Sequence, residues 1–310
     1  MRIAAIMLGL VVGCGDLSLA PDAAVGGGDD APGDAQTCLS RATYPLTITA
    51  GAFPPVAGHP NVIVVVPQGF DPGPPIDIVV FIHGFNNCIE DVVSDTNQAC
   101  TAGGAIRNAY SLAAQLEASG RNALLVVPEV AFDMATGDPG KLGDADGFRA
   151  LLTETLATVP APLGPIDLAR HDKIVVASHS GGYDAAAAMV SIGGVPVDEL
   201  WLLDSLYGYT MTFDAWVMQD LGSFTTLARR FADVYTTSGG TLANSQAMAS
   251  RAAMWNPNAE LDDRTTATLT DADYAHGLIF KHSALSHDDV PRYYFEHLLG
   301  TSSLSSARCP

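Results

Sequence analysis

Basic residues are scarce in this sequence. Its 310 residues include 15 Lys and Arg against 34 Asp and Glu, which gives a formal net charge of -19. A surface this negative repels phosphate backbones and anionic lipid head groups, so the composition argues against nucleic-acid binding. Charged residues nevertheless make up only 16% of the chain, against 48% for hydrophobic residues. That balance predicts a sizeable buried core and excludes global disorder.

The sequence also lacks the common signatures of cofactor and metal binding. It has no Gly-x-Gly-x-x-Gly fingerprint, no P-loop lysine, and no CxxC or Cys/His spacing of the kind that holds zinc. We therefore expect no cofactor. Internal repeats and a second linker are missing as well, which predicts a single folded domain over residues 38–310.

The apolar run at the N-terminus is too short to span a membrane. It covers ten residues, 3–12, whereas a spanning helix needs about 20 and a signal-peptide core about 7 to 15. The sequence VVGC at 11–14 resembles the signal of bacterial lipoproteins, in which the Cys thiol is acylated. The resemblance implies a signal peptide over 1–14 and a lipid anchor on Cys14. A plain secretory peptide or a misassigned start codon is the alternative.

Residues 15–37 are rich in Gly, Ala, Asp and Pro and show no apolar period, as in a flexible acidic linker. The lipoprotein resemblance then implies a protein held at the cell envelope. Gly15, and not Asp, follows Cys14, which in this class favours the outer membrane. A secreted or periplasmic protein is the alternative.

Four cysteines remain once Cys14 is set aside, an even number typical of disulfides in an oxidising compartment. Three pairings are possible for four cysteines. We expect Cys88–Cys100, which closes a short loop, and Cys38–Cys309, which joins the two ends of the domain. The short loop contributes about 3 kcal/mol in the chain-entropy model. Four free buried thiols are the alternative.

Short β-rich runs alternate with helical ones along the domain. Two leading strands, 45–50 and 61–67, are followed by apolar strands and periodic helices. This order predicts an α/β fold, a mostly parallel central sheet with helices on both faces. The expected strands are 76–84, 122–130, 173–178, 199–204 and 233–237, and the expected helices are 102–120, 147–159, 183–192, 212–232 and 290–299.

The segment SHSGG at 178–182 joins a β-branched strand directly to an alanine-rich helix. It resembles the nucleophile elbow of α/β-hydrolases, G-x-S-x-G, with Ser178 in place of the first Gly. The resemblance implies an α/β-hydrolase fold and a serine hydrolase with Ser180 as its nucleophile. Two other readings are a Ser that only caps the helix and a turn that cradles phosphate.

A second motif, His83-Gly84, ends the expected strand 76–84. It resembles the His-Gly turn of lipases and esterases, in which a backbone N–H after the motif forms half of the oxyanion hole. The resemblance implies that the amides of Phe85 and Gly181 stabilise the oxyanion and that His83 is structural.

The order of the family, Ser, then Asp or Glu, then His, implies a base and an acid downstream of Ser180. His287 lies just before the expected final helix and is the leading candidate for the base, with His282 and His276 as rivals and His297 more suited to packing. Asp204 ends an apolar strand and is the leading candidate for the acid. The other acid candidates are Asp262, Asp263, Asp271 and Asp273.

The resemblance implies acyl-enzyme hydrolysis of a carboxylic ester, from a small molecule or a lipid, by a monomer at the cell envelope. A catalytically inactive binding protein and an envelope peptidase or amidase are the alternatives. Residues 205–232 form either a wall of the acyl pocket or an amphipathic helix on the sheet.

Overall fold

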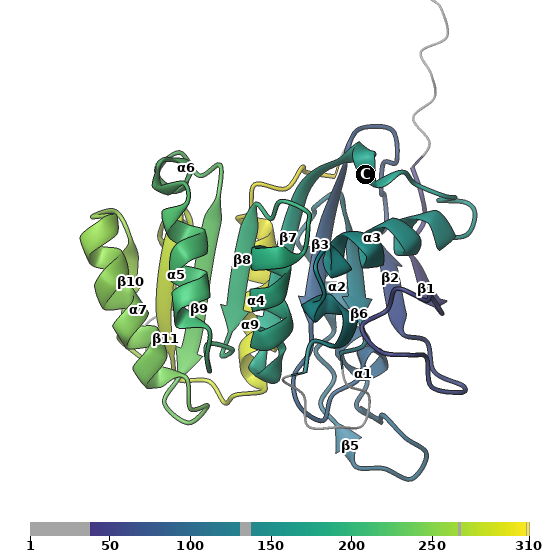
Figure 1. The fold of residues 1–310 in the computed structure, drawn as a ribbon, viewed down its shortest axis with the longest axis horizontal. Coiled ribbons are helices and arrows are strands. Elements are labelled where there is room, and N and C mark those ends of the chain that lie inside the picture. Colours follow the sequence, from purple (N-terminus) through teal and green to yellow (C-terminus); the bar gives the residue numbers. More distant parts are fainter. Residues whose placement is uncertain (1–37, 131–137, 266–267, 308, 310) are drawn as a thin grey trace, which may run out of the picture. The chain divides into compact units, whose positions relative to one another are not determined.

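A central sheet in the order β1-β2-β6-β3-β7-β8-β9-β11-β10 organises the fold in this computed structural model (Figure 1). The structure describes residues 38–130, 138–265, 268–307 and 309. The strands of the sheet are β1 (Ala42–Leu46), β2 (Val62–Val66), β3 (Ile76–Ile82), β6 (Ala123–Pro128), β7 (His171–His179), β8 (Glu199–Leu203), β9 (Arg230–Thr236), β10 (Glu260–Asp262) and β11 (Leu278–Ser283).

The remaining elements connect these strands. Strands β4 (Gln98–Ala99) and β5 (Ile106–Arg107) pair with each other outside the main sheet. The helices are α1 (Ile89–Val93), α2 (Leu112–Ala118), α3 (Gly147–Thr158), α4 (Tyr183–Ile192), α5 (Thr210–Met218), α6 (Leu221–Thr225), α7 (Leu242–Trp255), α8 (Asp271–Tyr274) and α9 (Asp289–Gly300). Three short 3-10 turns are η1 (Gly140–Gly143), η2 (Leu168–Arg170) and η3 (Ser180–Gly182).

The sheet is parallel except at one edge. Strand β2 pairs antiparallel with β1 and with β6, and the pairings from β6 through to β10 are parallel. Every residue of β3 and of β6 is buried, as expected for strands covered on both faces. The expected α/β-hydrolase fold is therefore confirmed, with the antiparallel strands leading and parallel strands following.

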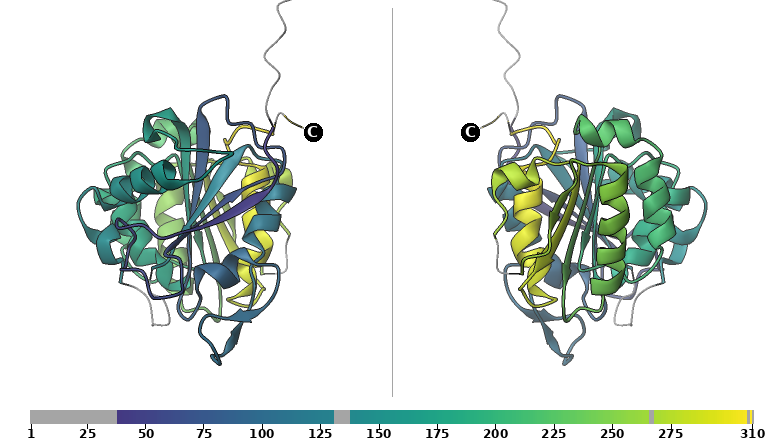
Figure 2. Two further views of the ribbon diagram at one scale, coloured as in Figure 1. Left: turned by 90° about the vertical axis from the view of Figure 1, so that its right-hand side faces the viewer. Right: turned by 90° about the vertical axis from the view of Figure 1, so that its left-hand side faces the viewer.

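Helices cover both faces of the sheet (Figure 2). One core lies under α3, α4, α5 and α7, and the other lies under α1, α2 and α9. Neighbouring strand residues contribute to opposite cores, so that Val126 of β6 belongs to the first and Val127 to the second. This alternation follows from the period of two along a strand.

Two of the expected helices are wrong in extent. The range 102–120 holds strand β5 before α2, because Gly103 has φ +76° and Ser111 has φ +57°, values that an α-helix does not tolerate. The range 212–232 is divided into α5, α6 and the start of β9. Asp220 caps α6 by accepting a hydrogen bond from the Ser223 amide, so a new helix begins there.

Both expected disulfides are confirmed. Cys38 and Cys309 are bonded with their Cα atoms 6.0 Å apart, and Cys88 and Cys100 with theirs 5.7 Å apart. The first bond joins residues separated by 271 positions and fastens the two ends of the domain. The second holds the β4–β5 hairpin to the start of α1.

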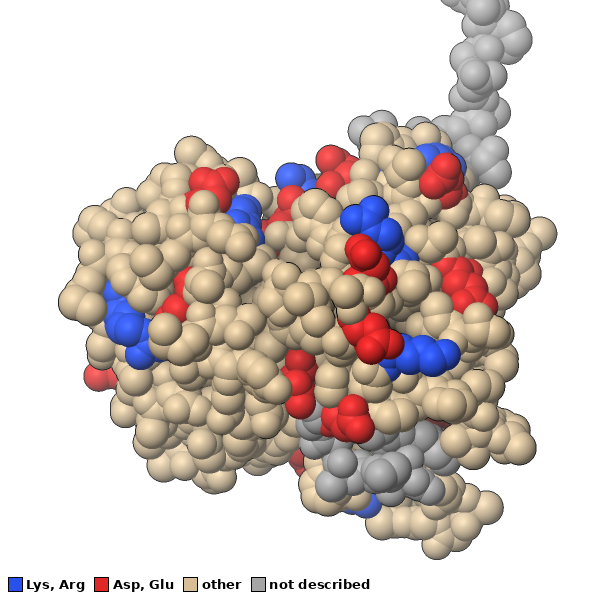
Figure 3. Space-filling model, viewed as in Figure 1, with Lys and Arg blue, Asp and Glu red and all other residues tan. Residues whose placement is uncertain are grey.

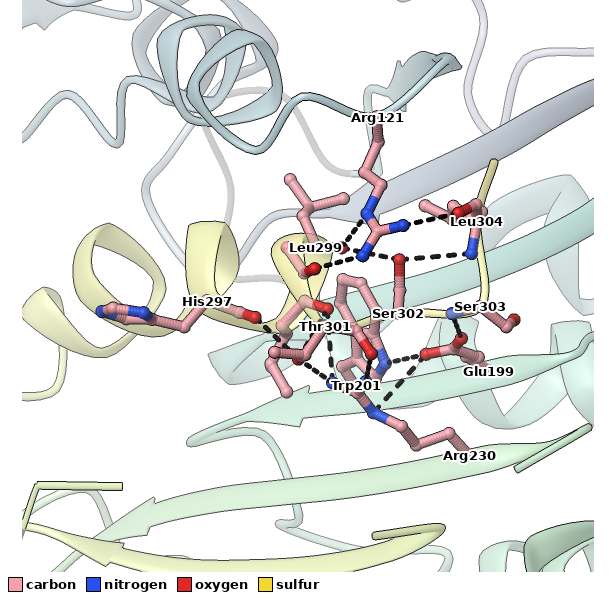
Figure 4. Close-up of polar contacts among 12 residues, drawn as sticks. Arg121, Glu199, Trp201, Arg230, His297, Leu299, Thr301, Ser302, Ser303 and Leu304 are labelled. Carbon is pink, nitrogen blue, oxygen red and sulfur yellow. Dashed lines mark hydrogen bonds and ion pairs between the residues drawn. The ribbon is translucent and has the colours of Figure 1, made fainter. Parts of the chain in front are cut away.

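Two arginines anchor the C-terminal end of α9 (Figure 4). Arg121 Nε donates to the backbone oxygen of Leu299 at 2.9 Å, and Arg230 Nη1 donates to that of Thr301 at 2.7 Å. The Arg230 guanidinium also lies 3.6 Å from the carboxylate of Glu199 on β8. Cations at the C-terminus of a helix satisfy its free carbonyl groups. These contacts fix the helix that immediately follows His287.

Charged side chains are spread thinly over the face of the domain seen in Figure 3. Acidic and basic residues are interspersed there, and most of that face is uncharged. The negative charge of the chain is therefore not concentrated into one acidic patch on this face.

Candidate active site

Ser180 occupies a sharp turn between a strand and a helix. Strand β7 ends at His179, η3 follows, and α4 begins at Tyr183. Ser180 has φ +51°, in the left-handed region that non-glycine residues rarely adopt. Such strain at a strand-to-helix turn exposes the side chain of the residue at its tip.

Glycines allow the turn to approach the neighbouring strand. A Cβ atom on Gly182 would lie 2.7 Å from the backbone oxygen of Ile82, at the end of β3. A Cβ on Gly84 would lie 2.5 Å from the Cβ of Ser180. Both contacts are closer than real Cβ atoms tolerate. The His83-Gly84 turn and the serine turn are therefore pressed together.

The departure from glycine at Ser178 has a structural reason. The Ser178 side chain is buried, and its Oγ lies 2.9 Å from Oγ of Ser205, the residue after Asp204. The Ser205 hydroxyl donates to the backbone oxygen of Ser180 at 2.8 Å. Ser178 must then donate to Ser205, whose own proton is committed. The hydroxyl pair ties the serine turn to the segment that follows β8.

His287 and Asp204 are joined directly. His287 Nδ1 lies 2.7 Å from Asp204 Oδ2, and the Asp204 side chain is fully buried. Thr236 donates to the same carboxylate from its amide at 3.2 Å and its hydroxyl at 2.7 Å, and the Thr241 hydroxyl donates as well. Burial alone would raise the pKa of Asp204, but the hydrogen bonds from His287, Thr241 and Thr236 outweigh it and lower the pKa. The carboxylate is ionised at neutral pH.

Gly239 leaves space for this carboxylate. A Cβ at that position would lie 1.9 Å from Asp204 Oδ2. The Gly239 amide donates to Thr236 Oγ1 at 2.8 Å, and that hydroxyl donates to Asp204. The loop after β9 therefore wraps closely around the acid.

The rival histidines contact other groups. His282 Nε2 lies 2.9 Å from Thr237 Oγ1, and its ring stacks on Tyr235 at 5.0 Å. His276 Nδ1 donates to the backbone oxygen of Asn258 at 2.7 Å. His297 stacks on Tyr274 with a separation of 5.7 Å between ring centroids.

The rival acids also have other partners. Asp262 receives a hydrogen bond from the buried Lys281 ammonium at 2.7 Å. Asp273 closes the capping box at the start of α8, of which Asp271 is the first residue. The side chain of Asp263 is exposed. Among the described residues, Asp204 is the carboxylate hydrogen-bonded to a ring nitrogen of His287. The carboxylate of Asp288 also lies near His287, but that residue is exposed.

His83 pairs with a buried acid. Its Nε2 lies 2.6 Å from Glu129 Oε1, and its Nδ1 lies 2.9 Å from the backbone oxygen of Gly84. Burial by itself would lower the pKa of His83, but the charge and hydrogen bond of Glu129 raise it. Glu129 also accepts the amide of Ile89 at 3.1 Å. This pair fixes the turn that carries Phe85.

A small cavity of about 260 Å³ opens beside Ser180 and His287. Phe85 lies on its wall with half of its side chain exposed, and Gly181 lies next to Ser180 in η3. Parallel strands β3 and β7 end here, the usual location of sites in open α/β sheets. The lining residues are Phe85, Asn86, Asn87, Ile106, Arg107, Asn108, His179, Ser180, His287 and Asp288.

A buried polar chain, not anticipated from the sequence, supports His287. His179 Nε2 donates to the backbone oxygen of His287 at 3.2 Å, and the two rings are 4.5 Å apart. The Tyr110 hydroxyl lies 3.0 Å from both His179 Nδ1 and Asn87 Oδ1, and Asn87 Nδ2 donates to Asp91 at 2.9 Å. Burial, together with His287, lowers the pKa of His179 to about 3. His179 is neutral and protonated on Nε2, since a carbonyl oxygen only accepts.

Tyr207 is a second residue that sequence reasoning missed. Its hydroxyl donates to the backbone oxygen of Gly239, and its ring lies edge-on to His287 at 6.3 Å. Burial and the charge of Asp204 raise the pKa of Tyr207 to about 12, against the opposing effect of a hydrogen bond with Ser180. Tyr207 lies in the range 205–232 that the sequence offered as a pocket wall, but no motif distinguished it from its neighbours.

In two clusters of potential metal ligands, some of the ligand atoms are already bonded to other protein groups. Cys88 and Cys100, which lie beside Asp91, are joined in a disulfide. In the cluster of His179, His287 and Asp288, both ring nitrogens of His179 have hydrogen-bond partners. Within the described ranges neither cluster offers a complete set of open ligands.

Comparisons with known proteins give structural similarity without sequence similarity. No family model matches the chain, and no curated protein matches it. A feruloyl esterase module from Clostridium thermocellum, complexed with sinapinate, is 12% identical with a TM-score of 0.49 and 86% of this chain and 88% of that chain covered. An S-formylglutathione hydrolase from Staphylococcus aureus is 10% identical, with a TM-score of 0.47 and coverage of 84% and 93%. Acetyl xylan esterase from Aspergillus awamori is 13% identical with a TM-score of 0.46, and the match covers 84% of this chain and 100% of that chain.

Proposed function

We propose that this protein is a serine hydrolase that cleaves carboxylic esters through an acyl-enzyme, with Ser180 as nucleophile, His287 as base and Asp204 as the acid that orients it. The observation that carries the proposal is the 2.7 Å contact between His287 Nδ1 and a buried, ionised Asp204. It gains support from Ser180, which lines the same cavity as His287 and has the strained φ of a nucleophile elbow.

In this mechanism the Ser180 hydroxyl attacks the ester carbonyl and passes its proton to His287 Nε2, the ring nitrogen that Asp204 does not contact. The proton then goes to the alcohol as it leaves, and an acyl-Ser180 ester remains. In the second half-reaction water attacks the acyl carbon while His287 takes its proton. His287 then returns that proton to Ser180 Oγ as the acyl–oxygen bond breaks and the acid is released. Asp204 keeps Nδ1 protonated throughout and stabilises the imidazolium.

The amides of Phe85 and Gly181 would stabilise the oxyanion. Their candidacy gains support from the close approach of the Gly84 turn to Ser180, which the absence of a Cβ at Gly84 permits. An oxyanion-hole donor contributes about 3 to 4 kcal/mol to the stability of the transition state. The start of α4 adds a favourable dipole on the same side.

We propose further that a lipid on Cys14 holds the enzyme at the cell envelope. Cys14 and the linker 15–37 lie outside the described residues, and the support is the VVGC sequence at 11–14 together with the two disulfides of the domain. None of the helices in the described part has the length and apolarity to cross a bilayer. Mass spectrometry of the N-terminal peptide tests the idea, because a Cys14→Ser variant must lose the added acyl mass.

A substrate panel tests the catalytic proposal. Purified full-length protein is expected to hydrolyse p-nitrophenyl esters of short acids, and Ser180→Ala and His287→Ala are expected to lose that activity. Hydrolysis of the matching p-nitroanilides at a comparable rate would indicate an amidase. If the folded wild type turns over neither series, a binding protein on the same fold becomes the better description.

A further inference from the structure

We infer that the substrate of this site carries a negatively charged group, most simply a carboxylate, which Arg107 binds. The inference rests on the proposed hydrolase function and adds the class of substrate. Its basis is Arg107, the one Lys or Arg among the described residues that line the cavity beside Ser180 and His287.

Arg107 differs from the other basic side chains that the structure describes. Each of the others has an ion pair, a hydrogen bond or a ring contact, and Arg107 has none among the described residues. In a chain with 34 acidic residues and a net charge of -19, a half-buried cation without an acidic partner is unusual. The partnered residues are Arg41, Arg121, Lys141, Arg149, Arg170, Lys173, Arg229, Arg230, Arg251, Arg264, Lys281 and Arg292.

The backbone around Arg107 is held firmly. Arg107 pairs with Gln98 in the β4–β5 hairpin, and the disulfide between Cys88 and Cys100 fastens that hairpin to the start of α1. Two residues later, the Ala109 amide donates to Asn97 Oδ1 at 2.9 Å. Strand β5 lies beyond the end of the main sheet (Figure 1). A cation on a cross-linked element is positioned in advance of binding, which lowers the entropy cost of using it.

The rest of the cavity wall suits a polar ligand. Asn86 and Asn108 contribute amide groups beside Arg107, and Asn87 is already bonded to Tyr110 and Asp91. Asp288 is the acidic residue of the wall, but it is exposed, so solvent and salt screen its charge more than that of the half-buried Arg107. A guanidinium binds a carboxylate through two parallel N–H···O hydrogen bonds, a bidentate geometry that a neutral group does not reproduce.

The size of the cavity limits the ligand. About 260 Å³ lies just below the usual range for small-molecule sites, roughly 300 to 1,000 Å³. A short chain with a polar end fits within that volume, whereas an extended lipid acyl chain would project beyond the cavity. A monoester of a short dicarboxylic acid, or an ester whose alcohol carries the carboxylate, matches both the volume and the charge.

Matched esters test the inference. p-Nitrophenyl hemisuccinate and hemiglutarate place the carboxylate on the acyl side, p-acetoxybenzoate places it on the leaving group, and p-nitrophenyl butyrate and phenyl acetate are the neutral counterparts. For wild type we expect kcat/KM to favour one anionic series over its neutral counterpart. Arg107→Gln should lower kcat/KM for that series roughly 10- to 100-fold and leave the neutral esters within about twofold. The preferred series identifies the half of the substrate that faces Arg107.

Three controls separate this inference from the proposed function. Arg107→Lys keeps the charge and should retain part of the preference, and Arg292→Gln removes a charge from α9 outside the cavity and should retain all of it. Labelling of Ser180 by a fluorophosphonate should be equal in wild type and Arg107→Gln. Normal labelling with no anionic preference in wild type, or with an equal loss for both ester classes in Arg107→Gln, overturns the Arg107 inference alone. Absence of labelling in wild type overturns the hydrolase proposal itself.

Discussion

His287 Nδ1 and Asp204 Oδ2 lie 2.7 Å apart although 83 positions separate the two residues in the chain. Asp204 follows β8 with φ +49°, and His287 lies between β11 and α9. Strands β8, β9 and β11 are neighbours in the sheet and run parallel, so their carboxyl ends bring the two loops together.

Asp204→Asn should therefore reduce kcat while the fold of the site is retained. An amide no longer stabilises the imidazolium and permits the wrong tautomer of His287, at a cost of roughly 10³- to 10⁴-fold in kcat. The measurement is kcat and KM for a p-nitrophenyl ester, with thermal unfolding as a check on the fold. Asp263→Asn changes an exposed rival position and should keep wild-type kcat. Loss of activity in Asp263→Asn with normal kcat in Asp204→Asn would show that Asp204 is not the catalytic acid.

Gly239→Ala should lower activity although Gly239 does not touch the cavity. The new Cβ would lie 1.9 Å from Asp204 Oδ2, so the carboxylate or the loop must shift. Misplacement of a catalytic group by about 1 Å costs on the order of 10²-fold in rate. Gly300→Ala is the control, since a Cβ there would meet no atom within 4 Å apart from its chain neighbours and the backbone of its own helix. Equal rates for both variants would show that the loop does not constrain Asp204.

Tyr110→Phe should impair the support of His287. The hydroxyl lies 3.0 Å from both His179 Nδ1 and Asn87 Oδ1, and all three side chains are buried. The hydroxyl has a single proton, so its removal leaves one buried acceptor without a donor, which costs about 1 to 3 kcal/mol of unfolding free energy. We expect kcat to fall about 10-fold with KM nearly unchanged. Tyr293 is 41% exposed, so Tyr293→Phe should change neither the free energy of unfolding nor kcat.

Asp233 gives a prediction about pH. This residue of β9 is fully buried, and burial raises its pKa to about 8. Between its unfolded pKa, about 4, and pH 8 the folded state binds a proton that the unfolded state has released. The contribution of Asp233 to stability therefore falls as pH rises through this window, by up to about 1.4 kcal/mol per pH unit.

Asp233→Asn should remove that dependence. Urea titrations at several pH values measure the free energy of unfolding. As pH rises from about 5 to 8, the variant should become more stable relative to wild type. Asp263→Asn provides the exposed counterpart and should keep the wild-type slope. Parallel curves for wild type and Asp233→Asn would mean that Asp233 is ionised when buried.

The sequence predicts those parts of the site that depend on local pattern. Ser180 could be located because a β-branched strand, a turn of small residues and an alanine helix follow one another. Asp204 closes an apolar strand, and His287 precedes an amphipathic helix. The disulfide pairs could be chosen from loop length and from the meeting of the chain ends.

The rest depends on contacts between distant segments. Arg107 lies in a range with helical period, where the positive φ values of Gly103 and Ser111 exclude a continuous helix. The link from Tyr110 through His179 to His287 joins two loops to the end of β7. Strand β11 contains Lys281 and His282, which conceal its apolar pattern; Lys281 is nevertheless buried because Asp262 neutralises it.

The central claim is that Ser180 is an activated nucleophile. The most direct measurement is labelling of the full-length protein with a fluorophosphonate, followed by peptide mass spectrometry to locate the adduct. We predict one adduct per chain, on Ser180, formed much more slowly in His287→Ala and absent in Ser180→Ala. Folded wild-type protein that resists the probe, or that carries the adduct on another residue, would contradict the account.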